Sequence, residues 1–375
     1  MSRFFASTAK GLVEVLESEL HSLGIERTER AMGGVFFDGN WEDCYRVNLK
    51  SRIASRILKP VDTFIAYQGD DLYFNAIKYD FTKHFDVNQT FKIEASVRDS
   101  KIQDQRFVAM KIKDAIADQF REKFDGQRPD VENFNPDVRI YVRGVKNKFE
   151  IAIDTSGESL FMRGYRKESG DAPMKENLAA SLLALAKWDK KTPVVDFMCG
   201  SGTILIEAAM AAMNLAPGSF RREFAFQRLK SYDESVWERL VQEAMNEEKQ
   251  DLDFHFYGYD VDRKAIAIAK QNAMRAGVDH VIEFKSESVA TVQAPCEKGL
   301  IVVNPPYGTR IGDEDNLRDV YRDMGFTLKH RFPGWTAWVL SGNKDLIADM
   351  KLKASQRRPV YNSNLECRFL RYDMF

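Results

Sequence analysis

The sequence predicts an α/β protein in which two small α+β units precede a larger domain built on an open parallel β-sheet. From about residue 190 onward, apolar runs of strand length alternate with helical segments, as in a parallel sheet covered by helices. Before that point, strand and helix patterns alternate over two shorter stretches, residues 1–62 and 63–160. A chain of 375 residues with 44% hydrophobic content can bury several cores of domain size. We therefore expect three domains, the third spanning residues 161–375.

Apolar positions within each unit repeat with the period of a helix or of a strand. The first unit is expected to hold a strand at residues 3–7, a helix at 11–23, a hairpin turn at 33–34 and a helix at 41–55. The second is expected to hold helices at 71–78 and 106–124 and strands at 90–95, 138–143 and 148–154. Apolar β-runs of the third domain lie at 193–197, 254–259, 299–303 and 336–340.

Composition excludes several classes of protein. The four cysteines form no C-x-x-C pair and the five histidines lack metal-ligand spacing, so neither a disulfide framework nor a metal site is expected. The N-terminal segment lacks the apolar core and cleavage site of a signal peptide, and no stretch reaches membrane-spanning length. A cytoplasmic protein is expected, whereas the oligomeric state does not follow from the sequence.

Charge is balanced over the chain, with 55 basic and 56 acidic residues, so any nucleic acid must be bound by local clusters rather than by bulk charge. For each cluster taken alone, solvated surface is the simpler interpretation. Three basic clusters occur, namely Arg139, Arg143, Lys146 and Lys148, then Arg221, Arg222, Arg228 and Lys230, then Lys351, Lys353, Arg357 and Arg358. The acidic stretch at residues 233–253 has helical apolar spacing and is expected to form a solvated helix without chemistry.

The strongest motif opens the third domain, where an apolar strand at 193–197 runs into a glycine turn and then a helix. Gly200 and Gly202 let a ligand approach the backbone, and the helix that follows offers free N–H groups and a favourable dipole. The spacing matches neither the dinucleotide fingerprint nor the P-loop, so a nucleotide phosphate is not expected.

A carboxylate after the next strand favours an adenosine-like ligand. Asp260 follows the apolar run at 254–259, at a position from which a carboxylate can bind a ribose diol. An ordinary glycine turn and a helix-capping aspartate explain either motif alone, but the two motifs in this order favour a binding site.

A third motif, Asn304-Pro305-Pro306-Tyr307, follows the strand expected at 299–303 and indicates the reaction class. Two prolines stiffen the turn, so the Asn304 side-chain oxygen and the Pro305 carbonyl can face one point as hydrogen-bond acceptors. An amino group that donates to both would aim its nitrogen lone pair at an electrophilic methyl, with Tyr307 stacked on the base. A rigid turn with a packed tyrosine is the alternative.

In this order, the three motifs resemble those of class I S-adenosylmethionine (SAM) methyltransferases that modify amino nitrogens. The whole chain is similar to THUMP-domain RNA guanine-N2 methyltransferases, above all to the bacterial 23S rRNA enzymes. Further segments carry this likeness, at residues 163–166, 172–179 and 216–218. The resemblance implies a ferredoxin-like domain (1–62), a THUMP RNA-binding domain (63–160) and a Rossmann-like methyltransferase domain (161–375).

The resemblance also implies roles for individual residues. SAM, released as S-adenosylhomocysteine (SAH), would be bound by Asp196, Met198, Cys199, Gly200, Gly202, Thr203 and Asp260. Where relatives often carry an aspartate for the adenine amino group, this chain departs from the pattern and offers Ser288, with Glu287 beside it. Glu176 and Asn177 are assigned either to the cofactor or to capping of the helix that they open. Asn304, Pro305, Pro306 and Tyr307 would be catalytic, holding the base. Apart from the resemblance, Arg139 and Arg143 of the first basic cluster are expected to contact RNA, and Arg163 and Arg166 could position RNA or close over the cofactor. A surface turn is the alternative for Arg163 and Arg166.

Rival functions stay open at this point. The substrate could be transfer RNA, and the same motif also serves methylation of adenine N6 and of glutamine amides. A noncatalytic RNA-binding assembly factor is another possibility, although it predicts erosion of motifs that are intact here. Some relatives carry a second methyltransferase domain, and this chain stops at Phe375, so a single modification is expected.

Overall fold

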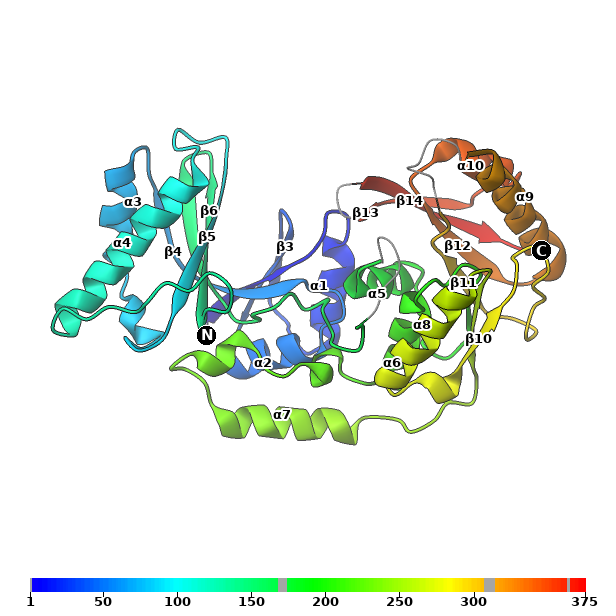
Figure 1. Cartoon of the computed structure of the whole chain (residues 1–375), viewed down its shortest axis with the longest axis horizontal. Coiled ribbons are helices and arrows are strands. Elements are labelled where there is room, and N and C mark those ends of the chain that lie inside the picture. The colour runs from blue at the N-terminus through cyan, green and yellow to red at the C-terminus, as the bar shows by residue number, and fades with distance from the viewer. Residues whose placement is uncertain (1, 168–173, 307–313, 363–364) are drawn as a thin grey trace.

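The computed structural model describes residues 2–167, 174–306, 314–362 and 365–375. The described strands form two seven-stranded sheets, one in each half of the chain. In Figure 1 the two N-terminal units and the C-terminal domain lie in a row along the long axis, and the C-terminal domain is on the right.

The first sheet extends through both N-terminal units. Its strands are β1 (Ser2–Ser7), β2 (Thr28–Ala31), β3 (Gly34–Gly39), β4 (Arg56–Ile65), β5 (Phe91–Arg98), β6 (Val138–Val145) and β7 (Lys148–Asp154). They lie in the order β2-β3-β1-β4-β7-β6-β5, and β5 and β6 are parallel. β4 pairs with β1 near its start and with β7 along its length, so a single strand joins the two units.

Helices cover this sheet and complete one continuous apolar core. They are α1 (Val13–Ser22), α2 (Trp41–Lys50), α3 (Gly69–Ala76) and α4 (Gln105–Lys123), with a 3-10 turn η1 at Phe81–Lys83. Asn40 starts α2 through a reciprocal capping box, in which its side chain accepts from the Asp43 amide and the Asp43 carboxylate accepts from the Asn40 amide, both at 2.9 Å.

The second sheet carries the C-terminal domain. Its strands are β8 (Val194–Asp196), β9 (Phe256–Asp260), β10 (Ile282–Ser286), β11 (Leu300–Val303), β12 (Thr336–Ser341), β13 (Gln356–Asn362) and β14 (Leu365–Asp373). The order is β10-β9-β8-β11-β12-β14-β13, with β8 to β12 parallel and β14 antiparallel to both of its neighbours. Strand order reverses between β8 and β11, and open α/β sheets bind ligands at such a switch point.

Helices lie on both faces of this second sheet. They are α5 (Glu176–Leu185), α6 (Thr203–Ala212), α8 (Arg263–Arg275), α9 (Glu314–Arg331) and α10 (Lys344–Asp349), with a 3-10 turn η4 at Asp279–Val281. Alternate residues of the strands divide between two cores: Leu300 and Val302 pack with α5, α6 and α8, whereas Ile301 and Val303 pack with α9 and α10. Burial on both faces explains why these strands read as continuous apolar runs.

One segment of the C-terminal half returns to the N-terminal half. It contains 3-10 turns η2 (Pro217–Phe220) and η3 (Ala225–Arg228) and helix α7 (Glu234–Asn246), which runs along the lower edge of Figure 1. Phe226 stacks on Tyr45 of α2 with ring centroids 4.4 Å apart, and Leu240 and Ala244 join the N-terminal core. The amphipathic helix predicted here is present, and its apolar face packs on the first unit.

Most predicted elements are present, with four differences. The helix predicted at 41–55 ends at Lys50, and β10 at Ile282–Ser286 was not predicted. β4 at Arg56–Ile65 was not predicted either. Pro60 argued against a strand in this segment, because proline lacks the N–H donor that strand pairing uses. The structure tolerates Pro60 because it lies at a register shift between β4 and β7. The antiparallel strands β13 and β14 were also omitted from a sheet expected to be parallel.

Candidate cofactor and base-binding site

The glycine turn between β8 and α6 has the backbone geometry that only glycine adopts readily. Gly200 and Gly202 have φ values of +53° and +82°, and Gly202 is the N-cap of α6. A Cβ on Gly202 would lie 2.9 Å from Phe284 Cζ, whereas a Cβ on Gly200 would meet no described atom within 4 Å. Gly202 therefore serves packing, and Gly200 borders an open space that a ligand can enter.

Asp260, at the end of β9, joins this turn to the neighbouring strand. Its Oδ2 accepts a hydrogen bond from Gly200 N at 2.9 Å, and its Oδ1 accepts one from Asp262 N at 3.0 Å. The Cys199 amide donates to Tyr259 O at 3.0 Å, so two strand ends are fixed side by side. Each Asp260 oxygen retains a lone pair, which suits a ribose diol.

Asp196 lies at the end of β8 and is 2% exposed. Burial raises the pKa of this carboxyl to about 8, the nearby Asp260 adds to the rise, and the hydrogen bond from Met198 N at 3.1 Å opposes it. A buried carboxyl without an ionic partner is expected to stay protonated, and an approaching ammonium group would favour its charged form.

Asn304 begins the turn after β11, at the same edge of the sheet. Its Oδ1 is buried and has no hydrogen-bond partner among the described residues. Pro305 is buried and Pro306 is exposed, and Tyr321 Oη of α9 donates to the Pro306 carbonyl at 3.3 Å. A buried acceptor without a partner is costly, so this oxygen is suited to a donor that arrives with a ligand. Tyr307, which we predict to stack on the base, lies outside the described residues.

The segment after β10 closes the other side of the site. Glu287 N donates to the Asp260 carbonyl at 3.1 Å, which places the following residues beside Asp260. Ser288 Oγ accepts from Ala290 N at 3.3 Å and thereby shapes a local turn. The assignment of Ser288 to the adenine ring stays a prediction.

Arg166, near the start of the third domain, approaches the glycine turn between β8 and α6. Its Nη2 donates to Thr203 Oγ1 at 2.6 Å and to the Met174 carbonyl at 3.0 Å, and its Nε lies 3.4 Å from Glu176 Oε1. Burial raises the pKa of Glu176, and Arg166 opposes that rise. Arg166 and Glu176 thus brace the start of α6 and hold the glycine turn in place.

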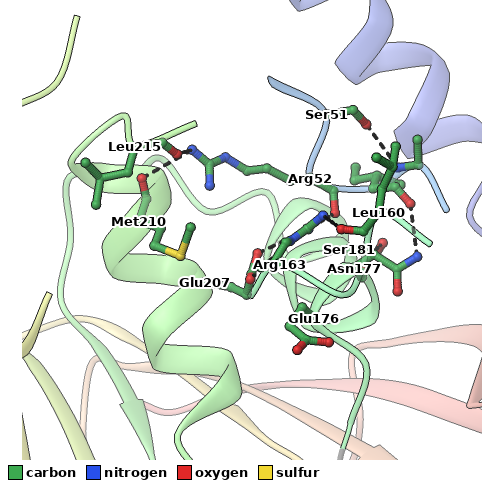
Figure 2. Close-up of polar contacts among 12 residues, drawn as sticks. Ser51, Arg52, Leu160, Arg163, Glu176, Asn177, Ser181, Glu207, Met210 and Leu215 are labelled. Atoms are coloured by element: carbon green, nitrogen blue, oxygen red, sulfur yellow. Dashed lines mark hydrogen bonds and ion pairs between the residues drawn. The ribbon is translucent and has the colours of Figure 1, made fainter. Parts of the chain in front are cut away.

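Arg163 lies deeper and is only 1% exposed (Figure 2). It forms an ion pair with Glu207 of α6 at 3.4 Å and donates to the carbonyls of Leu160 and Arg52 at 2.6 and 2.5 Å. Because its side chain is buried, Arg163 presents no surface that RNA could contact. Instead it links the end of α2 to α6.

Arg52 also connects the segment after α2 to α6, and Asn177 connects the same segment to α5 (Figure 2). Arg52 Nη2 donates to the carbonyls of Leu215 and Met210 at 2.6 and 3.2 Å. Asn177 is 4% exposed, and its amide donates to Ile53 O at 3.3 Å and to Ser55 Oγ at 3.0 Å. The sequence reading missed Arg52 and Glu207, because no local motif marks a contact between residues so far apart.

The second basic cluster is largely engaged within the protein, whereas in the first cluster only Arg139 makes side-chain hydrogen bonds to described residues. Arg221 donates to four backbone carbonyls of residues 156–162, and Arg228 pairs with Asp137 and Glu223. Arg139 donates weakly to two carbonyls at 3.4 Å, whereas Arg143 is exposed on β6. Of the four predicted RNA-contacting arginines, Arg143 is therefore the most accessible.

Three known families match successive parts of the chain. The RlmL ferredoxin-like domain matches residues 3–58, the THUMP domain residues 67–154, and the RMKL-like methyltransferase domain residues 163–371. The chain belongs to the RlmL-like family of SAM-dependent, THUMP-containing RNA methyltransferases. This RlmL-like chain thus has the α/β architecture predicted from its sequence, with ferredoxin-like and THUMP domains ahead of a Rossmann-like methyltransferase domain.

Relatives of the RlmL-like protein differ in length. A Synechocystis protein, slr0064, whose name proposes an RNA methyltransferase, is 38% identical over 99% of this chain and 97% of its own length. The ribosomal RNA large subunit methyltransferase K/L of Methylococcus capsulatus is 42% identical over 99% of this chain and 51% of its own length. The chain spans about half the length of the K/L relatives that it matches.

A solved structure supports the RlmL-like fold over its full length. SMU.472, whose name proposes a methyltransferase and which was crystallised with SAH, has a TM-score of 0.92 and 31% identity, covering 100% of this chain and 98% of its own. Within the described residues, we find neither a group of side chains arranged to hold a metal ion nor a helix long and apolar enough to cross a membrane.

Proposed function

We propose that this protein transfers a methyl group from SAM to the exocyclic N2 amino group of a guanine in 23S ribosomal RNA. The observation that carries the proposal is the buried, unpartnered Asn304 Oδ1, at the same sheet edge as Asp196, Gly200 and Asp260. The names of the K/L relatives support ribosomal RNA as the substrate. A ribosomal RNA substrate would place the enzyme in the cytoplasm.

The residues present fit SAM. Asp260 would accept the ribose hydroxyls, the open side of Gly200 would admit the methionine part, and the Asp196 carboxyl would meet the amino group. When bound, the cofactor supplies an electrophilic methyl group on its sulfonium. The braces from Arg166 and Glu176 to the start of α6 would keep this pocket in shape.

The chain's own residues would orient the acceptor. Asn304 Oδ1 and the Pro305 carbonyl would each accept one amino hydrogen, which holds the nitrogen lone pair out of conjugation with the ring and toward the methyl donor. Orientation of this kind acts in the transition state without a strong general base. The THUMP and ferredoxin-like domains would hold the RNA while the base occupies the site.

The test is methyl transfer from labelled SAM to protein-free 23S rRNA, 16S rRNA and bulk transfer RNA, followed by nucleoside digestion and mass spectrometry. N2-methylguanosine in 23S rRNA is the expected product. The same nucleoside in transfer RNA would reject the ribosomal substrate, and methyladenosine would reject the guanine assignment. Measurable SAH binding without transfer to any RNA, including isolated large-subunit assembly intermediates, would favour the noncatalytic assembly factor.

A further inference from the structure

A groove runs beside α10 on the face of the second sheet formed by β13 and β14. Its volume is about 490 Å³. Leu370, Ile347 and Leu352 supply an apolar floor, and Arg357, Arg368 and Lys344 lie along its rim. The groove therefore offers a flat apolar surface next to positive charge.

These rim cations, like Arg143 and Lys148 of the first basic cluster, are not used to hold the described part of the protein together. Arg357, Arg368 and Lys344 are exposed, and their side chains make no ion pair or hydrogen bond with any residue that the structure describes. One carboxylate, Glu366, also lines the groove, where it accepts from Tyr361 Oη at 3.2 Å, and the nearby Asp349 pairs with Arg318 at 2.8 Å. Three cations against one carboxylate leave the groove with net positive charge.

The floor of the groove contains an unsatisfied polar group. Tyr372 is 1% exposed, and its buried hydroxyl has no hydrogen-bond partner among the described residues. The Tyr372 side chain lines the groove together with Arg357. A buried hydroxyl without a partner is a site at which a ligand's polar group can bind.

The groove opens beside the turn that would hold the target base. Ser341, the last residue of β12, lines the groove, and its Oγ lies 3.4 Å from Tyr321 Oη. The same Tyr321 hydroxyl donates to the Pro306 carbonyl at 3.3 Å. Two contacts of hydrogen-bond length, Ser341 to Tyr321 and Tyr321 to Pro306, therefore connect the groove to the turn that begins at Asn304.

We propose that this groove binds the RNA strand that flanks the methylated base, with a backbone phosphate between Arg357 and Arg368 and the adjacent base on the apolar floor. The proposal rests on RNA being the substrate. A nucleotide combines one negative charge with a flat apolar ring, and side chains of these two kinds are what single-stranded RNA sites use. The target base must leave its base pair before it enters the site, so the adjacent nucleotide of the same strand can contact the groove.

The test uses the full chain with Arg357→Ala and Arg368→Ala combined. RNA affinity should fall and KM for RNA should rise at least tenfold, with SAH affinity unchanged. The slope of log K against log salt concentration should decrease by about 0.7, because the variant loses one single-strand phosphate contact. A matched control, Lys270→Ala with Lys298→Ala, removes the same charge from exposed positions away from the groove.

A second measurement locates the strand directly. A photo-crosslinking residue in place of Ala348 should attach to a nucleotide within about two positions of the modified base, and the same residue in place of Lys298 should not. Equal RNA affinity in the groove variant and the control, or crosslinks remote from the modified base, would overturn the proposal. RNA binding and crosslinking are read without turnover, so failure of the methylation reaction itself would be seen separately.

Discussion

At the scale of single residues, Asn304 provides the most direct test of the proposed methyl transfer. Asn304→Ala should reduce kcat at least 1,000-fold, roughly 4 kcal/mol of transition-state stabilisation, while SAH affinity stays within threefold. The Asn304 side chain contributes only a hydrogen-bond acceptor for the base, so its loss should leave the affinity for the cofactor unchanged. Single-turnover transfer and calorimetric SAH binding measure the two effects. A parallel loss of SAH affinity would instead make Asn304 a cofactor residue.

Asp196 predicts a pH dependence of cofactor binding. With a pKa of about 8, its carboxyl is protonated in the free protein at neutral pH, whereas a bound ammonium group favours the carboxylate. SAH affinity should therefore rise with pH, by up to about tenfold per unit, until about pH 8. The same raised pKa means that this group reduces the stability of the free protein as pH rises from about 4 to about 8.

Calorimetry of SAH binding between pH 6 and 8 tests this dependence. The Asp196→Asn variant is the control, because its amide does not titrate, and its affinity should be lower at pH 8 and flat across the range. A wild-type affinity that does not vary with pH would contradict the assigned contact between Asp196 and the cofactor's amino group.

At the scale of elements, the two glycines of the β8–α6 turn should respond differently to the same substitution. Gly202→Ala forces a Cβ to within 2.9 Å of Phe284 and adds the left-handed backbone penalty, so the loss of stability should be about 2 to 4 kcal/mol. The Cβ of Gly200→Ala would face open space, so this variant should lose only about 1 to 2 kcal/mol of stability through backbone strain. It should nevertheless weaken SAH binding, because the added methyl group would occupy the space proposed for the cofactor.

Urea unfolding and SAH calorimetry on both variants separate these effects. Each glycine variant serves as the control for the other, since both introduce one methyl group at a positive φ. Should Gly200→Ala bind SAH as tightly as the wild-type protein, the cofactor would have to lie elsewhere.

At the scale of the whole molecule, Arg163 joins the N-terminal units to the catalytic domain, because it donates to the Arg52 carbonyl while it pairs with Glu207 of α6. Both side chains are buried, so Glu207→Ala should destabilise the protein by about 3 to 5 kcal/mol, because it leaves buried guanidinium charge without its partner. Arg163→Met combined with Glu207→Leu should recover part of that loss. The comparison variant Glu42→Ala breaks partly exposed pairs with Arg46 and Arg239 and should cost about 1 kcal/mol. Urea unfolding followed by tryptophan fluorescence measures all three, and equal effects of Glu207→Ala and Glu42→Ala would contradict the role of the buried pair.

The sequence by itself determined the class of fold and the segments that build the site. Glycine turns, proline pairs and apolar runs act locally, so Gly200, Gly202, Asp260 and Asn304 could be placed at strand ends from their neighbours alone. Only the tertiary structure decided how distant segments meet: that β4 is shared by two units, that α7 packs on the first unit, and that Arg163 is buried against Glu207. The groove beside α10 likewise exists only because β13 and β14 extend the sheet past its last helix. The local pattern of charge and hydropathy cannot predict such contacts. A charged side chain such as Arg163 is buried only where it meets a partner, and that partner is distant in the sequence.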